Sequence, residues 1–323
     1  MSIVYFLNVG EGDCSVIEHN SGRLTMIDIN RVVEKFPFIQ SNRSILSLER
    51  FGNPKGNFHQ CEHPTDPIEF LKNNYPQKDL FRFILTHPDM DHLKGLKDLS
   101  EKIGFTNFWS YKNSKDGTSI RDEDLEDWNF YQTLLRDNKF LNLVDINNCQ
   151  YLPDDGLKIL SPNNELISKA NNDENWNDAS ATILYMTGGY KFLFCGDSGD
   201  NTWDYLIRNH KNEINNIDVL FAPHHGRNSD RNFDFLDIVR PNVTILGNAE
   251  SKYLAHDMYK NKSGYVFTNN QAGNFKFEIN AYKELEIYFS NEKFAESFCL
   301  TNGLTYVPKE NWFKIGFLKK NYV

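Results

Sequence analysis

Short apolar runs, separated by turns rich in glycine and asparagine, dominate the start of the chain. Runs of this kind occupy residues 3–7, 14–18 and 24–28. Each run has the length of one short strand, and the turns between the runs are tight. The pattern therefore predicts an antiparallel sheet that begins near the N-terminus.

Similar runs recur along the rest of the chain, with a few segments of helical spacing between them. Residues 181–186 and 190–195 are two apolar runs joined by a short glycine turn, which predicts a hairpin. The spacing of apolar positions predicts helices over 66–75 and 121–138, whereas the asparagine-rich segment 163–178 is expected to be a polar loop. Further strand-like runs cover residues 81–85, 105–111, 157–160, 218–222, 242–247, 264–268 and 275–279.

The composition shows that these elements can enclose a sizeable core. The chain has 323 residues, of which 40% are hydrophobic and 25 are phenylalanine. This length is compatible with a single sandwich domain that carries insertions. No apolar run approaches the roughly 18 residues of a membrane-spanning helix, and the N-terminus lacks the basic region of a signal peptide. We therefore expect no membrane association.

The net charge bears on the binding partners of the chain, and the cysteines bear on its cellular location. The formal net charge of −9 disfavours a broad electrostatic grip on nucleic acid, although a local basic groove is compatible with it. An odd number of dispersed cysteines without CxxC spacing is typical of reduced thiols, so a cytoplasmic location is expected. The five cysteines are Cys14, Cys61, Cys149, Cys195 and Cys299.

The densest chemical signal lies directly after the apolar run 81–85. His87, Asp89, Asp91 and His92 fall within six residues, and apolar positions at helical spacing follow them. A tight strand-to-helix loop can direct such side chains to one point, and imidazole with carboxylate suits zinc or, with more oxygen, manganese. The alternative is a polar turn in which Asp89 or Asp91 caps the helix.

Two later segments add side chains of the same kind. Asp197 follows the apolar run 190–195, and a buried carboxylate is costly unless it is hydrogen-bonded or binds a metal. His224 and His225 end the run 218–222, where both side chains can reach one cleft. The alternative for this pair is a purely structural role.

Residues 86–95, Thr-His-Pro-Asp-Met-Asp-His-Leu-Lys-Gly, resemble the His-x-His-x-Asp-His metal motif of the metallo-β-lactamase fold hydrolases. The segments Asn-Asp-Ala-Ser, Gly-Asp and Pro-His-His-Gly follow in that family's order. Asp89 at the second histidine position is similar to the branch that contains the C-terminal hydrolase domain of bacterial competence DNA-uptake channel proteins. The resemblance implies a four-layer αββα sandwich formed by one domain over 1–323, with an insertion loop at 31–63 and a C-terminal extension at 285–323.

The resemblance also implies a dinuclear site that holds two divalent ions, Zn²⁺ or Mn²⁺, and a bridging hydroxide that attacks the substrate. Asp91 belongs to the catalytic set as well as to the metal ligands. His224 would stabilise or protonate the reacting group, and the reverse assignment of His224 and His225 stays open. The expected metal ligands are His87, Asp89, Asp91, His92, Asp197 as the bridge, and His225.

The chain departs from the family pattern at three points. Asn8 stands where the family usually has aspartate, and Asn30 stands where it usually has glycine. No histidine lies between His92 and His210, so the first metal has one nitrogen ligand fewer and harder ions become more favourable. Two aspartates of the pattern, Asp13 and Asp28, are present and are expected to support the ligands without binding metal.

The expected activity is that of a metal-dependent phosphodiesterase or nuclease acting on nucleic acid or a nucleotide. Arg227, which replaces a serine of the branch, offers a planar fork suited to phosphate oxygens. One alternative is a small-molecule phosphodiesterase for cyclic nucleotides or phosphocholine esters. Another is a catalytically weak, metal-binding interaction module, and the extension 285–323 is a candidate surface for a protein partner.

Overall fold

The computed structural model describes residues 1–32, 56–136, 142–145 and 153–320 of the chain. Most of the expected insertion loop 31–63 and Cys149 lie outside these ranges. Within them, every helix falls short of the length and apolar character that a bilayer-spanning segment needs.

Ten strands form the larger of two sheets, and its two halves come from opposite ends of the chain. β1 pairs antiparallel with β14, so that Phe6 lies opposite Phe275. In order across the sheet the strands are β16 (Val307–Lys309), β17 (Trp312–Leu318), β15 (Leu285–Phe289), β14 (Phe275–Ile279), β1 (Ile3–Phe6), β2 (Ser15–Glu18), β3 (Leu24–Ile27), β5 (Leu80–Ile84), β6 (Phe105–Ser110) and β7 (Asn142–Asp145).

Six strands form the second sheet. β9 pairs antiparallel with β8 on one side and with β10 on the other. From β10 to β13 the neighbouring strands are parallel. In order across the sheet the strands are β13 (Tyr265–Thr268), β12 (Val243–Leu246), β11 (Val219–Phe221), β10 (Tyr190–Phe194), β9 (Thr182–Thr187) and β8 (Leu157–Ser161). The hairpin expected at 181–195 is confirmed.

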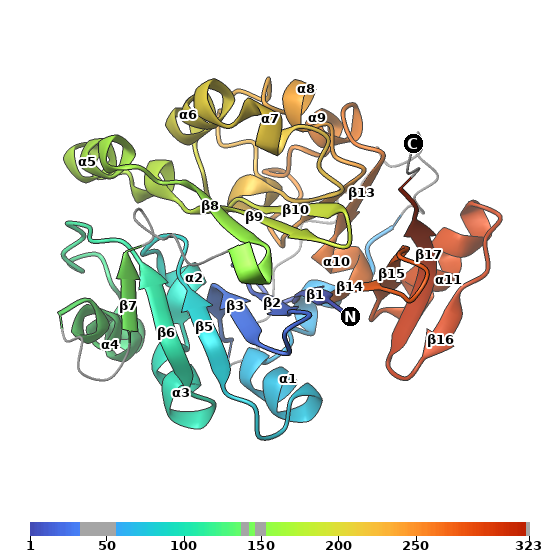
Figure 1. The fold of residues 1–323 in the computed structure, drawn as a ribbon, viewed down its shortest axis with the longest axis horizontal. Coiled ribbons are helices and arrows are strands. Elements are labelled where there is room, and N and C mark those ends of the chain that lie inside the picture. The colour runs from blue at the N-terminus through green and yellow to red at the C-terminus, as the bar shows by residue number, and fades with distance from the viewer. Residues whose placement is uncertain (33–55, 137–141, 146–152, 321–323) are drawn as a thin grey trace.

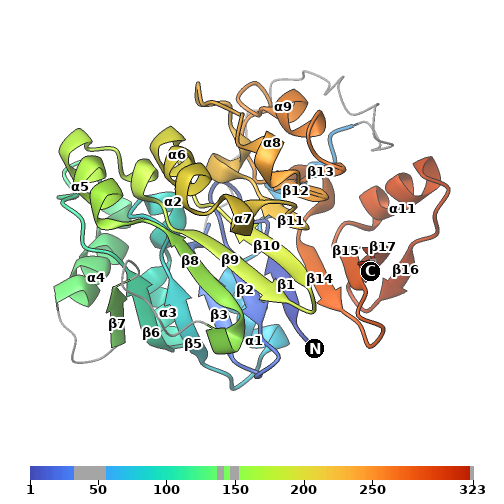
Figure 2. The same cartoon turned by 45° about the horizontal axis from the view of Figure 1, so that its top comes forward.

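The two sheets face each other, and helices cover both outer faces (Figures 1 and 2). α1 (Pro67–Asn74), α3 (Leu96–Lys102) and α4 (Leu125–Arg136) pack their apolar residues on the first sheet. α6 (Asp200–Asn209), α8 (Leu236–Val239) and α9 (His256–Lys260) do the same on the second sheet. This arrangement confirms the expected αββα sandwich.

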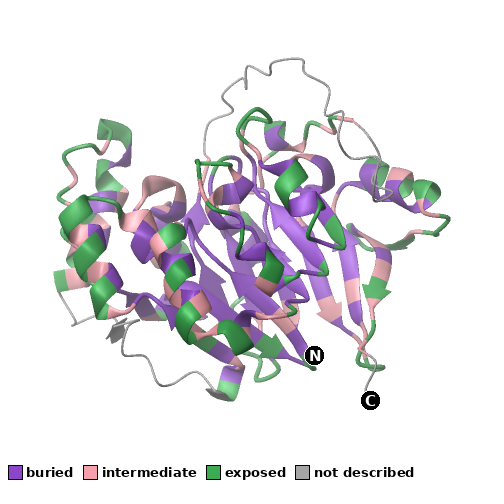
Figure 3. Cartoon of the chain, turned by 90° about the horizontal axis from the view of Figure 1, so that it is seen from above, coloured by how far each residue is buried: buried purple, intermediate pink, exposed green. Residues whose placement is uncertain are grey.

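The space between the sheets is the main apolar core. Phe6 of the first sheet contacts Phe221 of the second at a ring-centroid distance of 4.9 Å, and Phe194 stacks on Phe221 at 4.5 Å. Most strands of both sheets are buried, as Figure 3 shows, whereas β16 and much of β17 are not. Burial on both faces explains why most of the strands appear in the sequence as continuous apolar runs.

Two segments differ from or add to the sequence-based expectations. Residues 163–178 are not a loop, because α5 (Asn164–Asp173) forms there and a short 3-10 helix, Trp176–Ala179, follows it. Asn163 caps α5 by accepting a hydrogen bond from the backbone N–H of Leu166 at 2.9 Å.

At the C-terminal end, β15 to β17 continue the first sheet beyond β14, and α11 (Glu292–Thr301) packs against β15 and β17.

The sheet connections bring the polar motifs to one edge of the sandwich. β5 leads into Thr86 and His87, β10 leads into Asp197, and β11 leads into His224 and His225. Because β10 and β11 are parallel, their carboxyl ends lie together at the same edge. The residues that follow these strands therefore converge.

Candidate metal centre

The first part of the centre is built around the end of β5 and the short helix α2 (Met90–Leu93). His87 and His92 are both fully buried, and their ring centroids are 4.2 Å apart. Asp89 precedes α2 but makes no side-chain hydrogen bond to the helix backbone. The alternative in which Asp89 serves as a helix cap therefore fails.

Asp28 fixes the orientation of His92 from the neighbouring strand end. The Nδ1–H of His92 donates to Asp28 Oδ2 at 2.8 Å. The same carboxylate accepts from the backbone N–H of Thr86 at 2.7 Å and from the Thr86 hydroxyl at 2.6 Å. These bonds leave Nε2 of His92 directed into the centre, in the manner of a carboxylate that orients a metal-binding histidine.

His225 approaches the same point from the second sheet. Its Nδ1–H donates to Asp13 Oδ1 at 2.9 Å, and its Nε2 lies 3.1 Å from Asp91 Oδ2. Asp13 thus contacts the ring nitrogen that faces away from the centre. This geometry matches the supporting role expected for Asp13 and Asp28.

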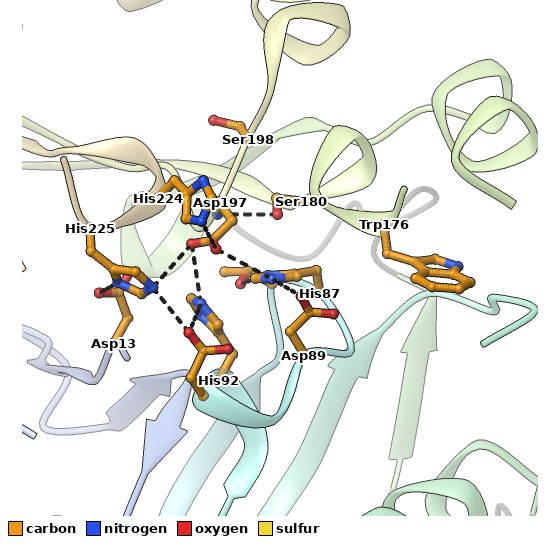
Figure 4. A network of polar contacts seen from close by, with 12 residues as sticks. Asp13, His87, Asp89, His92, Trp176, Ser180, Asp197, Ser198, His224 and His225 are labelled. Carbon is orange, nitrogen blue, oxygen red and sulfur yellow. Dashed lines mark hydrogen bonds and ion pairs between the residues drawn. The ribbon is translucent and has the colours of Figure 1, made fainter. Parts of the chain in front are cut away.

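Asp197 stands between two groups of histidine nitrogens (Figure 4). Its Oδ1 is 3.1 Å from His92 Nε2 and 3.7 Å from His225 Nε2. Its Oδ2 is 3.8 Å from His87 Nε2 and 3.6 Å from His224 Nε2. The two carboxylate oxygens therefore face different sets of potential ligand atoms.

Three of these atoms, Nε2 of His87, Nε2 of His92 and Oδ1 of Asp197, are buried without a well-formed hydrogen bond, although the last two lie at ion-pair distance from each other. One nitrogen or oxygen atom from each of Asp13, His92, Asp197 and His225 lies within 4.8 Å of the others, so Asp13 is near this group as well as hydrogen-bonded to His225. Unsatisfied buried polar atoms are costly, and atoms about 2.1 Å from one tetrahedral ion lie about 3.4 Å apart. The residues present therefore fit a bound divalent cation.

The electrostatics of the centre agree with this fit. Burial alone lowers the pKa of His92, but the carboxylates of Asp197 and Asp91 outweigh burial and raise that pKa well above its ordinary value. Against burial, Asp197 and Asp13 likewise raise the pKa of His225 to about 10. Burial opposes ionisation of Asp197, yet His225 and His92 hold its pKa well below the usual range. The carboxylates are therefore ionised, and a metal would displace protons from the imidazoles.

The turn that carries the histidine pair has an unusual backbone. His224 and His225 have φ values of 53° and 55°, in the left-handed region that non-glycine residues rarely adopt. The turn is held by the backbone N–H of His224, which donates to Gly196 O at 2.9 Å, and by that of Arg227, which donates to His224 O at 2.9 Å. Strain of this kind persists where the surroundings enforce it, as at functional sites.

His224 differs from His225 in its surroundings. Its side chain is 23% exposed, and Nδ1 shares a hydrogen bond of 2.9 Å with the Ser229 hydroxyl. Burial lowers the pKa of His224 to about 4; Asp197 opposes this shift, and the positive charges of His225, Arg231 and Arg227 add to it. His224 is therefore neutral at neutral pH in the metal-free protein.

Asp89 lies at the rim of the centre and has a partner that the sequence analysis missed. Its Oδ2 is 3.7 Å from His87 Nε2, and its Oδ1 accepts from Lys115 Nζ at 2.5 Å. Burial would raise the pKa of Asp89, but His87 and Lys115 hold it well below the usual range. No motif surrounds Lys115, so the sequence offered no signal for it.

The two guanidinium groups near His224 belong to the same loop. Arg227 was expected from the sequence; its Nε is buried without a hydrogen-bond partner, and its backbone pairs with Leu254. Arg231 was not expected; it donates from Nη1 to the carbonyl of Ser198 at 3.1 Å. Both groups are near enough to His224 to lower its pKa.

The asparagines that depart from the family pattern have structural partners. The amide of Asn8 donates to Gln60 O at 2.6 Å and to His63 O at 3.2 Å. The amide of Asn30 donates to the carbonyls of Val9 and Glu11. Neither an aspartate at position 8 nor a glycine at position 30 could donate these side-chain bonds, so both asparagines stabilise the loops around the centre.

Ser180 supports Asp197, because its hydroxyl accepts from the Asp197 backbone N–H at 3.2 Å. Asn177 lies in the 3-10 helix that precedes Ser180, in the stretch between His92 and His210 that has no histidine. The structure thus brings together all of the expected ligands, and it places His224 beside them.

Comparison with known proteins identifies similar folds but no family by sequence. No family model matches the chain, and no curated protein matches it. Igni18, a metallo hydrolase from the hyperthermophilic archaeon Ignicoccus hospitalis, is 15% identical with a TM-score of 0.49; the alignment covers 86% of this chain and 100% of Igni18. YhfI, a metallo-β-lactamase fold protein from Bacillus subtilis, is 11% identical with a TM-score of 0.44 over 85% and 99% of the two chains.

A third similar structure belongs to a different kind of enzyme. CmlA, a diiron β-hydroxylase from Streptomyces venezuelae, is 11% identical with a TM-score of 0.45, and the alignment covers 82% of this chain and 52% of CmlA. The chain thus spans about half the length of CmlA. The roles of the residues in the centre therefore rest on the geometry described above.

Proposed function

We propose that the chain is a metal-dependent hydrolase of phosphodiesters with two divalent ions, Zn²⁺ or Mn²⁺, in its centre. The observation that carries this proposal is the position of Asp197. Its Oδ1 faces His92 and His225, and its Oδ2 faces His87 and His224, at distances of 3.1 to 3.8 Å. A carboxylate with oxygens turned to two ligand groups suits a bridge between two ions.

In this assignment His87 and Asp89 hold one ion, and Asp91, His92 and His225 hold the other. Ions bound there would lower the pKa of a water molecule and stabilise negative charge on the attacked phosphate. Nitrogen ligands favour zinc, whereas the large share of carboxylate oxygen makes manganese at least as suitable.

The protein's own groups would position the ligands and the substrate. Asp28 and Asp13 hold His92 and His225 in place through their Nδ1 atoms. When the Ser229 hydroxyl donates to Nδ1 of His224, the Nε2–H of the neutral ring can donate a hydrogen bond to a phosphoryl oxygen.

Two differences support His225 as the ligand and His224 as the substrate contact. His225 is almost fully buried, and an aspartate fixes its ring, whereas His224 is 23% exposed and bonded to a serine. Arg227, next to this pair, would bind a non-bridging phosphate oxygen.

The expected substrate is a phosphodiester of nucleic acid or a nucleotide. Asp89 in the motif supports a relation to the competence DNA-uptake branch of the metallo-β-lactamase fold hydrolases. The proposal retains the cytoplasmic location expected from the dispersed cysteines.

Metal-reconstituted protein tests this function directly. The protein is stripped with a chelator, loaded with Zn²⁺ or Mn²⁺, and assayed on bis(p-nitrophenyl) phosphate, DNA, RNA and cyclic nucleotides. We expect about two bound ions and metal-dependent turnover, with manganese at least as effective as zinc. Protein that binds metal and cleaves none of these phosphodiesters would overturn the proposal, and a zinc-only enzyme would overturn the assigned metal preference.

A further inference from the structure

A polar cavity of about 480 Å³ lies beside the proposed centre, between the segment 113–116 and one face of α4. Its volume is within the range of about 300–1,000 Å³ that small-ligand sites occupy. The residues that line it include Ser114, Lys115, Asn129, Gln132, Thr133 and Arg136.

Lys115 joins this cavity to the centre. Lys115 is one of the residues that line the cavity, and its ammonium group donates to Asp89 Oδ1 at 2.5 Å and lies 5.2 Å from the ring centroid of Trp176. Asp89 in turn is 3.7 Å from His87 Nε2, and Figure 4 shows the Trp176 ring beyond Asp89. The cavity is thus one side chain away from the proposed metal ligands.

The segment that forms the outer wall is held in place by specific contacts. Asn113 donates from its amide to the Tyr131 hydroxyl of α4 at 2.6 Å, and the backbone N–H of Ser114 donates to Asn171 Oδ1 of α5 at 2.9 Å. Gly117 has a φ of 83°, and a Cβ there would lie 2.1 Å from Nε1 of Trp128. The wall therefore has one defined position on α4, so the cavity is preformed.

The lining has the chemistry of a site for a polar anion. Arg136 is exposed and supplies a guanidinium fork, whereas the charge of Lys115 is paired with Asp89. Asn129 and Gln132 offer amides that both donate and accept, as the edges of nucleobases require. Asp116, the acidic residue of the wall, already accepts from the backbone N–H of Thr118 at 2.9 Å.

We propose that this cavity binds a nucleotide unit, with its phosphate on Arg136 and its base or sugar on the amides of α4. The inference rests on the proposed function, since it places this unit next to the scissile phosphodiester. The unit is either a small nucleotide ester or the end of a single strand, because both present the same chemistry.

Binding measurements on the metal-free protein test the cavity without requiring turnover. Titration calorimetry compares adenosine 5′-monophosphate, adenosine and inorganic phosphate as probes. We expect the nucleotide to bind tightest and Arg136→Ala to weaken it about tenfold, as the loss of one charge-assisted hydrogen bond implies. Arg208→Ala is the matched control, since Arg208 is 74% exposed and paired with Asp204 on α6, and it should leave the affinity unchanged.

Three results would overturn the proposal: no binding of the nucleotide, equal affinity in wild type and Arg136→Ala, or adenosine binding as tightly as its monophosphate. A trideoxynucleotide that displaces the monophosphate supports a strand end as the source, and one that fails to do so supports a free nucleotide. Gln132→Ala should weaken the binding of the nucleotide more than the binding of inorganic phosphate.

Kinetics of the metal-loaded protein separate this inference from the proposed function. The ratio of KM for thymidine 5′-p-nitrophenyl phosphate to KM for bis(p-nitrophenyl) phosphate should rise about tenfold in Arg136→Ala and stay at the wild-type value in Arg208→Ala. An unchanged ratio in Arg136→Ala overturns the cavity as a substrate site. Nucleotide binding that depends on Arg136 in a protein without hydrolytic activity would overturn the proposed function and leave the cavity assignment standing.

Discussion

Asp197 is the residue on which both halves of the proposed centre depend, because its oxygens face opposite ligand groups. Asp197→Asn keeps the shape of the side chain but removes the negative charge that would neutralise two cations. We expect the loss of at least one bound ion and a fall in kcat of about a thousandfold or more, with the fold retained. Metal analysis, kinetics and circular dichroism check this, and wild-type activity at full metal content would place the bridge elsewhere.

His224 and His225 allow a sharper comparison, because they are adjacent in the chain but lie in different surroundings. His225→Ala removes a buried ring held by Asp13 and should release an ion. His224→Ala removes a partly exposed ring and should lower kcat about a hundredfold while metal content stays nearly unchanged.

Metal content measured side by side decides between these assignments. Loss of an ion in His224→Ala, with retention in His225→Ala, would invert the roles of ligand and substrate contact. A loss in both variants would make His224 a ligand as well.

Single residues show where the sequence was sufficient and where it was not. The crowding of His87, Asp89, Asp91 and His92 into six residues predicts a metal site, and the resemblance to the metal motif supplies their assignment as ligands. Lys115 could not be predicted, since its contact with Asp89 depends on how the segment 113–117 packs against α4. Contacts of this kind arise from packing between distant segments and leave no local pattern.

At the scale of elements, the turn of residues 223–226 places both histidines and depends on a close backbone approach. Gly226 follows them with a φ of 83°, and a Cβ there would lie 2.6 Å from Leu246 Cδ2. Gly303 has a similar φ of 65° with nothing within 4 Å of a built Cβ. An alanine at either position would have to adopt an unfavourable positive φ. Only at position 226 would its Cβ also clash with a neighbour.

We expect Gly226→Ala to lower the free energy of unfolding by about 2–4 kcal/mol and Gly303→Ala by about 1 kcal/mol. Urea denaturation of the metal-free protein measures both, and their difference isolates the clash with Leu246. Equal losses in the two variants would show that the turn relaxes to accept the extra methyl group.

The elements themselves were predictable where burial is strong and periodic. The strands β1, β9 and β10 lie on apolar runs recognised in the sequence. α5 was predicted to be a loop because its apolar residues are few, although Leu166 and Ala170 are buried four residues apart. Its asparagines lie at the cap, on the exposed side or, as Asn171, in contact with Ser114 and Trp176, and composition alone suggests a loop.

At the scale of the whole molecule, the strand order could not be predicted from local pattern. β1 pairs with β14, so that Phe6 lies opposite Phe275, and apolar periodicity carries no information about such distant partners. The resemblance of the metal motif supplied the αββα architecture instead. The C-terminal strands, which no motif marks, join the larger sheet and leave its last strand, β16, fully exposed.

His19 provides a pH-sensitive contact between the body of the first sheet and the segment that leads into the second. Its Nδ1–H donates to the carbonyl of Asp155 at 3.1 Å, and its Nε2 accepts from the Thr25 hydroxyl at 2.7 Å. Burial, opposed by Asp155 and aided by Arg82, lowers the pKa of His19 to about 4. The folded protein therefore keeps this ring neutral well below the pH at which an unfolded chain protonates it.

The stability that follows is fully present above the unfolded pKa of 6.5 and is lost as the pH falls towards 4, since only the unfolded chain binds a proton in that range. The loss between pH 7 and pH 5 amounts to about 2 kcal/mol. His19→Gln cannot titrate, so its free energy of unfolding should fall by about 2 kcal/mol less than that of the wild type over this interval. The comparison uses urea denaturation in a chelator, which removes any contribution of bound metal.

His59→Gln is the control, because His59 is 54% exposed and pairs only with nearby Glu62 among the described contacts, and it should keep the wild-type pH dependence. If His19→Gln kept that dependence as well, the ring would have to be protonated or solvated in the folded protein, contrary to its buried contacts with Asp155 and Thr25.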